Sequence, residues 1–404
     1  TRFDPTFHIR AARVDAPGSS EQLKELAARL LSKHLPRSRP LWEVHVIDGL
    51  SDGRFALLAK VHHCLVDGVG GMHLLEALLS PFPGASVPER PDHRPRRCPD
   101  APTLLRSELR QRFAHAKSLV ESRSLRGIGR QLSGIKDAAI TGLTRVGRSP
   151  FASKDASRYR RFEWARFDLG EVKRIRTAFG GTVNDVLVAA TTGAARRYLT
   201  RDGVDVTDVE SLRAVLPVHT GGARRRNVSG NRVAMLLATL PLEPSSPRER
   251  MNRVIEMTSR LKDESHQSEG MQLLEDIADA TAGSILSEAM KVASQMEAFD
   301  LILTNIPGPQ VPLYLLGAKL ESVYPVVPLM PRQTLGIALF SYDGGVFWGI
   351  NADRGAFPDL PRFIEDLEAS YRALRREADD LAPRRPTEPR PSDPSVSGQV
   401  TFPN

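Results

Sequence analysis

The amino-acid sequence predicts an α/β protein, in which strands and helices alternate along the chain. Three observations lead to this fold class. Short apolar segments typical of strands alternate with segments whose apolar residues recur every three or four positions, as in amphipathic helices. Turn-forming pairs such as Asp48-Gly49 and Gly180-Gly181 separate many of these segments. Finally, 404 residues, of which 41% are hydrophobic, are enough for two domains or one large two-lobed unit.

Three strands and two helices are expected in the first 86 residues. Ser19 and Gln22 have the spacing of a capping box and predict the start of the first helix. The pairs Asp48-Gly49 and Asp52-Gly53 predict a hairpin between the second and third strands. The glycines between Gly68 and Gly71 predict a tight turn before the second helix. The expected strands are Phe7–Val14, Trp42–Ile47 and Arg54–Val61, and the expected helices are Ser19–His34 and Met72–Leu79.

From residue 161 onward the same alternation continues. Gly180-Gly181 ends one helix, and Thr182, followed three residues later by Asp185, begins the next. A turn at Tyr342–Gly345 predicts a second hairpin, and Asn305–Pro309 predicts a rigid turn. The expected strands are Arg161–Phe167, Arg213–Pro217, Val233–Leu240, Leu301–Thr304, Gly336–Ser341 and Val346–Asn351, and the expected helices are Glu171–Phe179, Thr182–Leu199, Arg248–Lys262, Gln272–Met296 and Leu360–Arg376.

Composition divides the chain into four parts. Residues 1–86 and 161–380 are the two α/β regions, and residues 87–160 form a basic linker with crossover helices. Residues 381–404 are expected to be disordered, because Pro and Asp are frequent there and no apolar periodicity persists.

The positive charge is concentrated in the linker. The chain has a formal net charge of +8, and residues 90–161 contain 18 Lys or Arg against 6 Asp or Glu. Leu and Ile residues lie among these charges between Leu104 and Ile140, a pattern typical of helices that lie on anionic membranes. A solvated crossover between two lobes is the alternative. Nucleic acid is not an expected partner, because no binding motif accompanies the charge and aromatic residues are few.

Cysteine content and hydropathy favour a cytoplasmic protein. Two cysteines, Cys64 and Cys98, are too few for a disulfide framework. No stretch of 18 apolar residues predicts a transmembrane helix, and the first residues contain no apolar signal core.

The run His62-His63-Cys64-Leu65-Val66-Asp67-Gly68 is the candidate catalytic site. It follows the strand expected at Arg54–Val61, and loops at strand ends commonly carry catalytic residues. Adjacent side chains on a strand point to opposite faces, so only one of the two histidines can normally face a substrate. A neutral imidazole accepts a proton from an alcohol near physiological pH. Asp67 can either orient that imidazole or hold the turn by pairing with an arginine.

Two other interpretations of the histidine pair stay open. The histidines can be ordinary loop residues followed by an Asp-Gly turn. They can also bind a metal ion, but the run lacks a third ligand at a spacing such as His-x3-His. Neither a metal nor a bound cofactor is therefore expected.

Six short motifs, taken in order, resemble those of one known family. They are Pro40-Leu41-Trp42-Glu43, His62 to Gly68, Asn184-Asp185, Gly230-Asn231 followed by Leu240-Pro241, Asn305 to Pro309, and Ala352-Asp353-Arg354 to Pro358-Asp359. Over about residues 1 to 378 the chain resembles the bacterial wax ester synthase/acyl-CoA:diacylglycerol acyltransferases. Members of that family usually begin with about fifty further residues that supply a strand and a helix. This chain begins at a segment, Phe3 to Arg10, that resembles the family's next one, so we expect that opening part to be missing.

The resemblance implies a fold and a reaction. The family shares the architecture of chloramphenicol acetyltransferase and of nonribosomal peptide condensation domains. These proteins have two similar α/β lobes, each a mixed sheet with helices, with an active-site tunnel between them. The implied reaction moves an acyl group from acyl-CoA, a co-substrate, to diacylglycerol or a long-chain alcohol. The product is triacylglycerol or a wax ester. The implied location is the cytoplasm, with peripheral attachment to the inner membrane or to lipid droplets.

The resemblance also assigns the catalytic steps. His63 takes the hydroxyl proton, and the resulting imidazolium protonates the CoA thiolate. No covalent intermediate is needed, so the neighbouring Cys64 is not expected to be a nucleophile. Asp67 is expected to hold the loop through an arginine that the sequence does not identify.

Five further residues are expected around this centre. His62 and Gly68 belong to the active-site loop, and the backbone near Gly68 or the amide of Asn184 is expected to stabilise the oxyanion. Trp42, Asn184 and Asp185 are expected to line the substrate site. The latter two also lie in a first helical turn, where Asp is favoured without any catalytic role.

Three function classes compete. The first is the lipid acyltransferase. The second is a carrier-protein-dependent condensing enzyme or polyketide acyltransferase, which carries the same histidine motif. The third is a non-catalytic lipid-binding homologue. The motifs from Asn184 to Asp359 favour the first class over the second, and the intact His63 and Asp67 argue against the third.

Overall fold

The computed structural model describes two α/β regions of the chain. The described residues are 4–62, 64–65, 68–86, 100, 102–107, 110, 151, 153, 157–201, 203–206, 209, 212–219, 233–267, 299–330 and 332–381. The expected helix at Gln272–Met296, the tail from residue 382 onward and most of the basic linker lie outside them.

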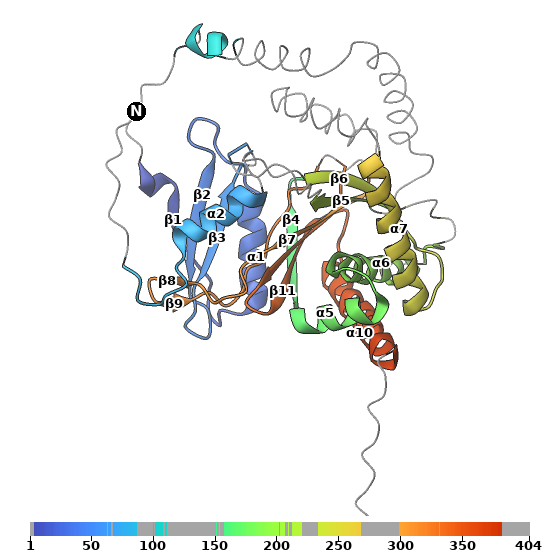
Figure 1. Ribbon diagram of the computed structural model, residues 1–404. Helices are drawn as coiled ribbons and strands as arrows, with labels where there is room; N and C mark the ends of the chain where they lie inside the picture. The colour runs from blue at the N-terminus through green and yellow to red at the C-terminus, as the bar shows by residue number, and fades with distance from the viewer. Residues whose placement is uncertain are drawn as a thin grey trace, which may run out of the picture.

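The N-terminal region is a small α/β lobe (Figure 1). Its described strands lie in the order β1-β2-β3, with β1 parallel to β2 and β2 antiparallel to β3. The sheet is therefore mixed, and the hairpin expected between the second and third strands is confirmed. The elements are the 3₁₀ turn η1 Pro5–Phe7, β1 Ile9–Arg13, α1 Ser20–Leu31, β2 Trp42–Asp48, β3 Ala56–Val61 and α2 Gly68–Leu78.

Helix α1 begins where the sequence predicts. The Ser19 hydroxyl accepts a hydrogen bond from the Gln22 N–H at 3.3 Å, and the Gln22 side chain accepts one from the Ser19 N–H at 2.8 Å. From this start the helix lays Leu30 against Val14 and Ile47. These three residues are the buried centre of the small lobe.

The C-terminal region is a larger α/β lobe. Its described strands form a six-stranded mixed sheet in the order β4-β11-β10-β7-β5-β6. The strands are β4 Arg160–Asp168, β5 Leu212–His219, β6 Val233–Leu240, β7 Leu301–Pro307, β10 Leu335–Tyr342 and β11 Gly345–Asp353, and the helices are α5 Leu169–Phe179, α6 Val183–Arg201, α7 Pro247–Gln267 and α10 Leu360–Leu381. The four helices lie together on one side of this sheet (Figure 1).

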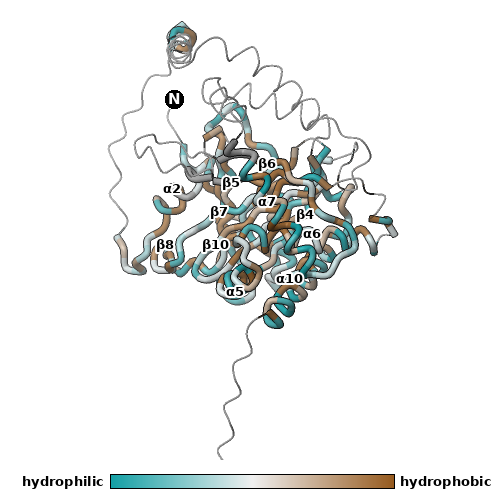
Figure 2. The backbone as a smooth tube through the Cα atoms, turned by 45° about the vertical axis from the view of Figure 1, so that its right-hand side comes forward, coloured by the Kyte–Doolittle hydropathy of each residue, from teal (hydrophilic) through white to brown (hydrophobic). Residues whose placement is uncertain are grey.

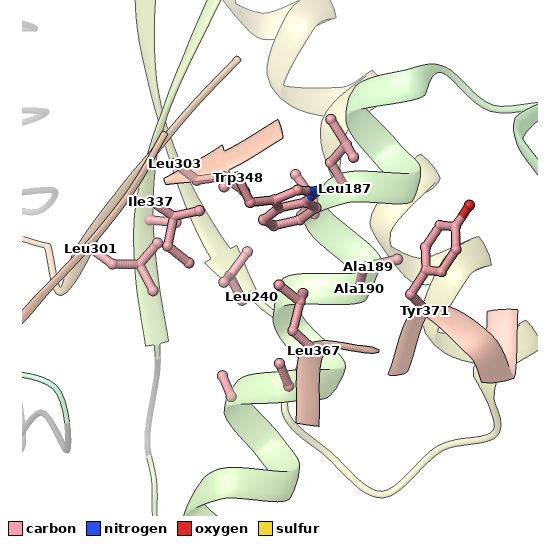
Figure 3. Close-up of a cluster of buried hydrophobic side chains, with 14 of the residues drawn as sticks. Leu187, Ala189, Ala190, Leu240, Leu301, Leu303, Ile337, Trp348, Leu367 and Tyr371 are labelled. Atoms are coloured by element: carbon pink, nitrogen blue, oxygen red, sulfur yellow. The ribbon is translucent and has the colours of Figure 1, made fainter. Parts of the chain in front are cut away.

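The centre of the larger lobe is apolar and tightly packed. Helix α6 is buried along most of its length, because small residues such as Ala189 and Ala190 let it lie close to its neighbours. Trp348 of β11 is fully buried, and the close-up in Figure 3 places it beside Leu187 of α6. In Figure 2 the strands are largely hydrophobic, whereas α10 alternates between hydrophilic and hydrophobic positions.

The lobes are joined by helix α1 and by a segment that crosses the large sheet. Ala27 and Ala28 of α1 pack on Phe162 of β4. Residues 320–330, which we call the strap, run along β10 and β11 without regular structure. A Cβ atom at Gly349 would lie 1.7 Å from the Pro325 carbonyl oxygen, so only glycine allows the strap to approach β11 this closely.

Just before the strap, a short hairpin contacts the small lobe. Strands β8 Tyr314–Leu315 and β9 Ala318–Lys319 pair antiparallel. Ser80, which follows α2, exchanges two backbone hydrogen bonds with Tyr314, at 2.9 and 2.8 Å. Leu75 of α2 packs in the same cluster as Leu313 and Tyr324.

The structure corrects two details of the sequence analysis. Helix α2 begins at Gly68, four residues earlier than expected, so the glycines from Gly68 to Gly71 form its first turn instead of a tight turn before it. Strand β7 continues through Asn305 to Pro307, so the rigid turn begins only at Gly308. The expected stop at Gly180 is confirmed, with φ of 72° in the left-handed region. None of the described helices is long and apolar enough to cross a membrane.

Candidate active site

The described part of the histidine motif is a turn at the end of β3. His62 follows the last strand residue, and its N–H donates to the Leu41 carbonyl at 2.9 Å. Its Nδ1 accepts a hydrogen bond from the Cys64 N–H at 3.1 Å, and its carbonyl accepts one from Leu65 at 2.9 Å. The His62 side chain therefore supports the turn. His63 and Asp67 lie outside the described residues, and their roles stay predictions.

The Pro-Leu-Trp-Glu motif holds this strand end from the neighbouring strand. The Leu41 carbonyl binds His62, as described above. The next residue, Trp42, stacks on His8 with ring centroids 4.5 Å apart, and its carbonyl lies 2.7 Å from His8 Nδ1. The expected lining role of Trp42 stays a prediction, but the contact explains why this motif precedes the histidines.

Below the histidines, Lys60 anchors β3 in the interior of the small lobe. Its ammonium group donates to the Glu43 carboxylate at 2.7 Å and to the carbonyls of Leu30 and Lys33, at 2.9 and 2.6 Å, at the end of α1. Burial acts to raise the pKa of Glu43, but the hydrogen bond and the positive charge of Lys60 outweigh it and lower that pKa. His45, also buried, has its Nε2 atom 3.4 Å from the same carboxylate. One lysine thus fixes the strand, its neighbour and the helix.

Asn184 and Asp185 lie at the start of α6 in the larger lobe. Asp185 is buried and accepts hydrogen bonds from the Thr182 N–H and hydroxyl at 2.7 and 2.8 Å. The Thr258 hydroxyl of α7 donates to its other oxygen at 2.7 Å. These bonds cap α6 and attach α7 to it, which is the structural role that the sequence position favours.

Asn184 contacts a residue that the sequence analysis did not connect with it. The Asn305 side-chain amide on β7 donates to Asn184 Oδ1 at 2.7 Å. With its oxygen engaged in this way, Asn184 keeps its own amide N–H groups as donors. Both asparagines border a cavity of about 30 Å³, which has room for about two water molecules. Its other walls are mostly apolar: Leu187, Val188, Leu216, Leu236, Leu261, Leu303 and Leu339.

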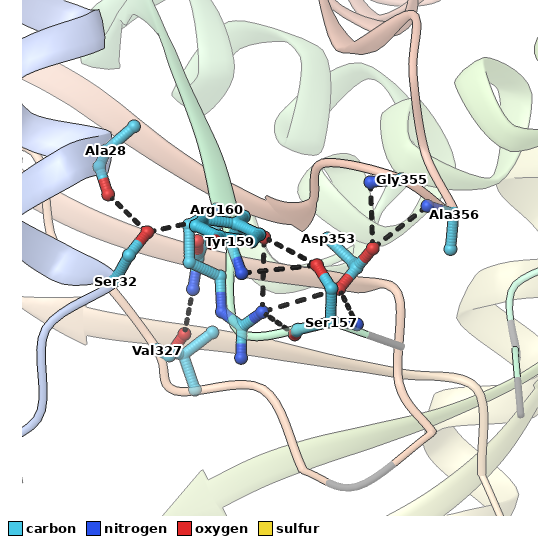
Figure 4. Close-up of polar contacts among 10 residues, drawn as sticks. Ala28, Ser32, Ser157, Tyr159, Arg160, Val327, Asp353, Gly355 and Ala356 are labelled. Carbon is cyan, nitrogen blue, oxygen red and sulfur yellow. Dashed lines mark hydrogen bonds and ion pairs between the residues drawn. The ribbon is translucent and has the colours of Figure 1, made fainter. Parts of the chain in front are cut away.

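The two remaining C-terminal motifs have structural contacts. Gly308 donates its N–H to the Ser341 hydroxyl at 3.2 Å, and a Cβ there would lie 2.4 Å from the Phe340 ring. Asp353 is fully buried and accepts hydrogen bonds from the N–H groups of Gly355 and Ala356, both at 2.9 Å (Figure 4). These motifs shape the larger lobe.

Asp353 also belongs to a junction between the lobes. The Arg160 guanidinium lies 3.5 Å from Asp353 Oδ2. Burial lowers the pKa of Arg160, and the Asp353 charge opposes that shift. The Arg160 N–H donates to the Ser32 hydroxyl at 3.0 Å, which in turn donates to the Ala28 carbonyl at 2.7 Å (Figure 4). The hydroxyl at the end of α1 therefore links the small lobe to β4.

Sequence reasoning missed Lys60, Asn305 and Arg160 as partners. Lys60 carried a detectable signal, because a lysine inside an apolar strand requires a buried partner. Asn305 and Arg160 reach residues more than a hundred positions away, so no local spacing indicates them.

Comparison with known protein families assigns the chain. The model of the wax ester synthase/diacylglycerol acyltransferase catalytic domain matches residues 1–187, and the model of the C-terminal domain matches residues 229–375. The chain belongs to the wax ester synthase/diacylglycerol acyltransferase family. It is therefore an acyltransferase, and the resemblance seen in the sequence is confirmed.

Two relatives of Mycobacterium tuberculosis illustrate the similarity. The protein named diacylglycerol O-acyltransferase tgs1 is 31% identical over 382 residues, which cover 93% of this chain and 80% of the relative. The corresponding tgs2 protein is 30% identical over 388 residues, which cover 93% of this chain and 82% of the relative.

Solved structures agree with the fold. The wax ester synthase/diacylglycerol acyltransferase of Marinobacter aquaeolei VT8 matches with a TM-score of 0.66 and 27% identity, over 94% of this chain and 82% of that chain. The first condensation domain of the calcium-dependent antibiotic synthetase matches with a TM-score of 0.51 and 18% identity, over 93% and 79% of the two chains. The expected architecture of two mixed α/β lobes is thereby confirmed. The tunnel between them stays a prediction.

Proposed function

We propose that this acyltransferase moves a fatty acyl group from acyl-CoA to diacylglycerol, giving triacylglycerol, and that it also accepts long-chain alcohols, giving wax esters. One observation carries the proposal: the complete run His62 to Gly68 stands at the end of β3 in a chain of this family. The relatives' names, diacylglycerol O-acyltransferase, support diacylglycerol as the acceptor.

In the proposed mechanism, the imidazole of His63 takes the proton from the acceptor hydroxyl. The oxygen attacks the thioester carbonyl, so a C–O bond forms as the C–S bond breaks. The imidazolium returns its proton to the CoA thiolate, and the histidine ends as it began. Asp67 holds the loop by pairing with an arginine, and His62 supports the turn. The anchoring of β3 by Lys60 supports this assignment, because a general base needs a fixed position.

Asn184 is the proposed donor to the oxyanion, together with backbone N–H groups near Gly68. Its oxygen accepts from Asn305, which favours an orientation with the amide N–H groups available. Trp42, Asn184 and Asp185 complete the proposed surroundings of the substrate. Asp185 acts there through the start of α6, since both its oxygens are bonded.

The proposed location is the cytoplasm, with peripheral attachment to the inner membrane or to lipid droplets. Both the acyl acceptor and the product are lipids, so the enzyme must meet a lipid phase. The basic composition of residues 90–161 supports attraction to anionic headgroups. Salt is expected to weaken this attraction, which vesicle flotation at low and high salt measures.

The central test compares the two histidines. His63→Ala should lower turnover about 10²- to 10⁴-fold, the usual contribution of a general base. His62→Ala should lower it less at equal folded yield, because its ring supports only the turn. Purified variants are assayed with labelled palmitoyl-CoA and a panel of diacylglycerol and hexadecanol. A folded His62→Ala protein that is the more damaged of the two would reverse the assignment.

The amide pair is tested by a double-mutant cycle. Asn184→Ala should lower kcat about 10²-fold, as removal of an oxyanion donor does, and Asn305→Ala about tenfold, because it only orients Asn184. The double variant should then be no slower than Asn184→Ala alone. Asn351→Ala is the matched control, since that buried asparagine binds the Val327 carbonyl far from the motif in sequence and should affect stability alone. Independent, multiplicative losses would show that Asn305 does not act through Asn184.

A further inference from the structure

The tip of the β8–β9 hairpin carries an unusual residue. Leu316 has φ of 51° and is followed by Gly317 with φ of 88°, so both turn residues are left-handed. Hairpin turns of this kind favour Asn-Gly, because a branched apolar side chain is strained there. Leu316 is also 78% exposed. Neither backbone geometry nor core packing explains a leucine at this position.

A second exposed apolar side chain lies beside this tip. Phe82, 69% exposed, follows Ser80 by two residues, and Ser80 is bonded to Tyr314 of the hairpin. A Cβ atom at Gly317 would lie 3.6 Å from the Pro83 carbonyl oxygen, so the loop and the hairpin tip are neighbours. Leu78 and Val311, 55% and 51% exposed, flank them in the two segments. We call Leu78, Phe82, Val311 and Leu316 the apolar tip.

Charge is absent from both segments that form the apolar tip. Residues 77–86 and 306–318 contain no Asp, Glu, Lys or Arg, although such residues make up 26% of the chain. The next residue, Lys319, is paired with Asp343 at 2.9 Å. An ordinary solvent-exposed surface carries charges, so two uncharged segments joined at four exposed apolar side chains indicate a contact surface.

We propose that the apolar tip inserts into the surface of an anionic phospholipid bilayer. Its side chains project from a hairpin tip and a loop, a shape that enters a deformable apolar phase. They expose on the order of 500 Å², below the roughly 800 Å² per partner that a stable protein interface buries. The chain that follows the tip supplies charge of the matching sign: four arginines against one aspartate between Arg90 and Arg97. Apolar insertion and basic residues together are the two signals that a peripheral protein needs.

The geometry relates this surface to the histidine motif. Helix α2 begins at Gly68, the last residue of the motif, and ends at Leu78 in the apolar tip. Eleven helical residues span about 16 Å, so the motif lies within one short helix of the membrane surface. This inference goes beyond the proposed reaction, because vesicle binding is measured without acyl transfer.

The test is flotation of the full chain with vesicles of phosphatidylcholine containing phosphatidylglycerol. Phe82→Ser/Leu316→Asn should bind at least tenfold more weakly than the wild type. Leu316→Asn alone should bind several-fold more weakly and fold at least as well, because asparagine tolerates the left-handed turn. Tyr159→Ser/Leu381→Asn removes exposed apolar side chains from the larger lobe and should bind like the wild type. Melting curves show that the variants are folded.

Four results would overturn the proposal. They are undiminished binding by the folded tip variants, no binding by the wild type, equal binding to vesicles of phosphatidylcholine alone, and a wild-type dimer in sedimentation that the tip substitutions abolish. The last result would assign the tip to a second copy of this chain. Loss of acyl transfer in a His63 variant affects none of these measurements, so the two proposals fail separately.

Discussion

The two lobes differ in what stabilises their sheets. In the larger lobe every residue of β11 is buried, and one apolar cluster joins the sheet to four helices. In the smaller lobe β1 is almost entirely exposed, and the buried cluster consists of Val14, Leu30 and Ile47. The larger lobe is therefore stabilised mainly by apolar burial. The smaller lobe, which carries the histidines, depends on a few polar contacts and on its neighbour.

The polar contacts lie where the chemistry needs precision. Lys60 and Glu43 are two and nineteen residues before His62 and are almost completely buried. The contacts with the neighbour are those of α1 with Phe162 and of α2 with Leu313. We infer that the smaller lobe opens more easily than the larger one, and that its opening displaces the strand end that carries the motif.

The largest expected effect comes from breaking the lysine anchor. Lys60→Met leaves the Glu43 carboxylate buried without its partner and removes the donor from two carbonyls of α1, which should destabilise the smaller lobe by about 3–5 kcal/mol. Hydrogen exchange should show lost protection in β1–β3 and unchanged protection in β10 and β11.

The control for that experiment is Lys60→Met/Glu43→Leu. It replaces the ion pair by apolar side chains and should recover most of the lost stability. Equal loss of protection in both lobes after the single substitution would contradict the division drawn here.

A smaller effect is expected from the contact that holds the strap on the large sheet. Gly349→Ala places a methyl group against the Pro325 backbone and should lower stability by about 1–3 kcal/mol, because the strap must shift. Gly355→Ala is the matched control, since its Cβ would have an ordinary contact of 3.5 Å. Thermal melting measures both, and equal melting temperatures would show that the strap yields without loss of stability.

The smallest effect is a dependence of the small lobe on pH. The pKa of Glu43 lies below its ordinary value near 4.5, so its charged form favours the folded state. That stabilisation is fully present above pH 4.5 and is lost as the pH falls through the lowered folded-state pKa. Glu43→Gln should be less stable at neutral pH and should show a flatter loss below pH 4.5. Chemical denaturation at several pH values measures the slope, and parallel curves for the two proteins would exclude Glu43 as its source.

The fold was largely predictable because its elements carry local signals. The box at Ser19, the glycine at Gly180 and the hairpin turn before Gly345 act within a few residues of the chain, and all three are found in the structure. The β8–β9 hairpin was not predictable, because each strand has two residues and its partner Ser80 is distant in sequence. Helix α2 began early because tertiary packing outweighs the low helix propensity of glycine.

The candidate site was predictable in part. The run from His62 to Gly68 combines residue types with a defined chemistry at fixed spacing, so the sequence alone indicates it. The bond between Asn184 and Asn305 depends on how α6 lies against β7, which no pattern in either segment specifies. Lys60 lies between these cases, since its burial in a strand could be suspected but its three acceptors could not be named.

The bond between Ser80 and Tyr314 has a consequence for protein synthesis. The two residues are roughly 230 positions apart, so a ribosome that adds about 5–20 residues per second makes the second about 10 to 50 s after the first. During that interval the nascent chain presents Leu75 and Leu79 of α2 without the partners that later cover them. A chaperone that binds short apolar segments has time to act on this helix before the larger lobe exists.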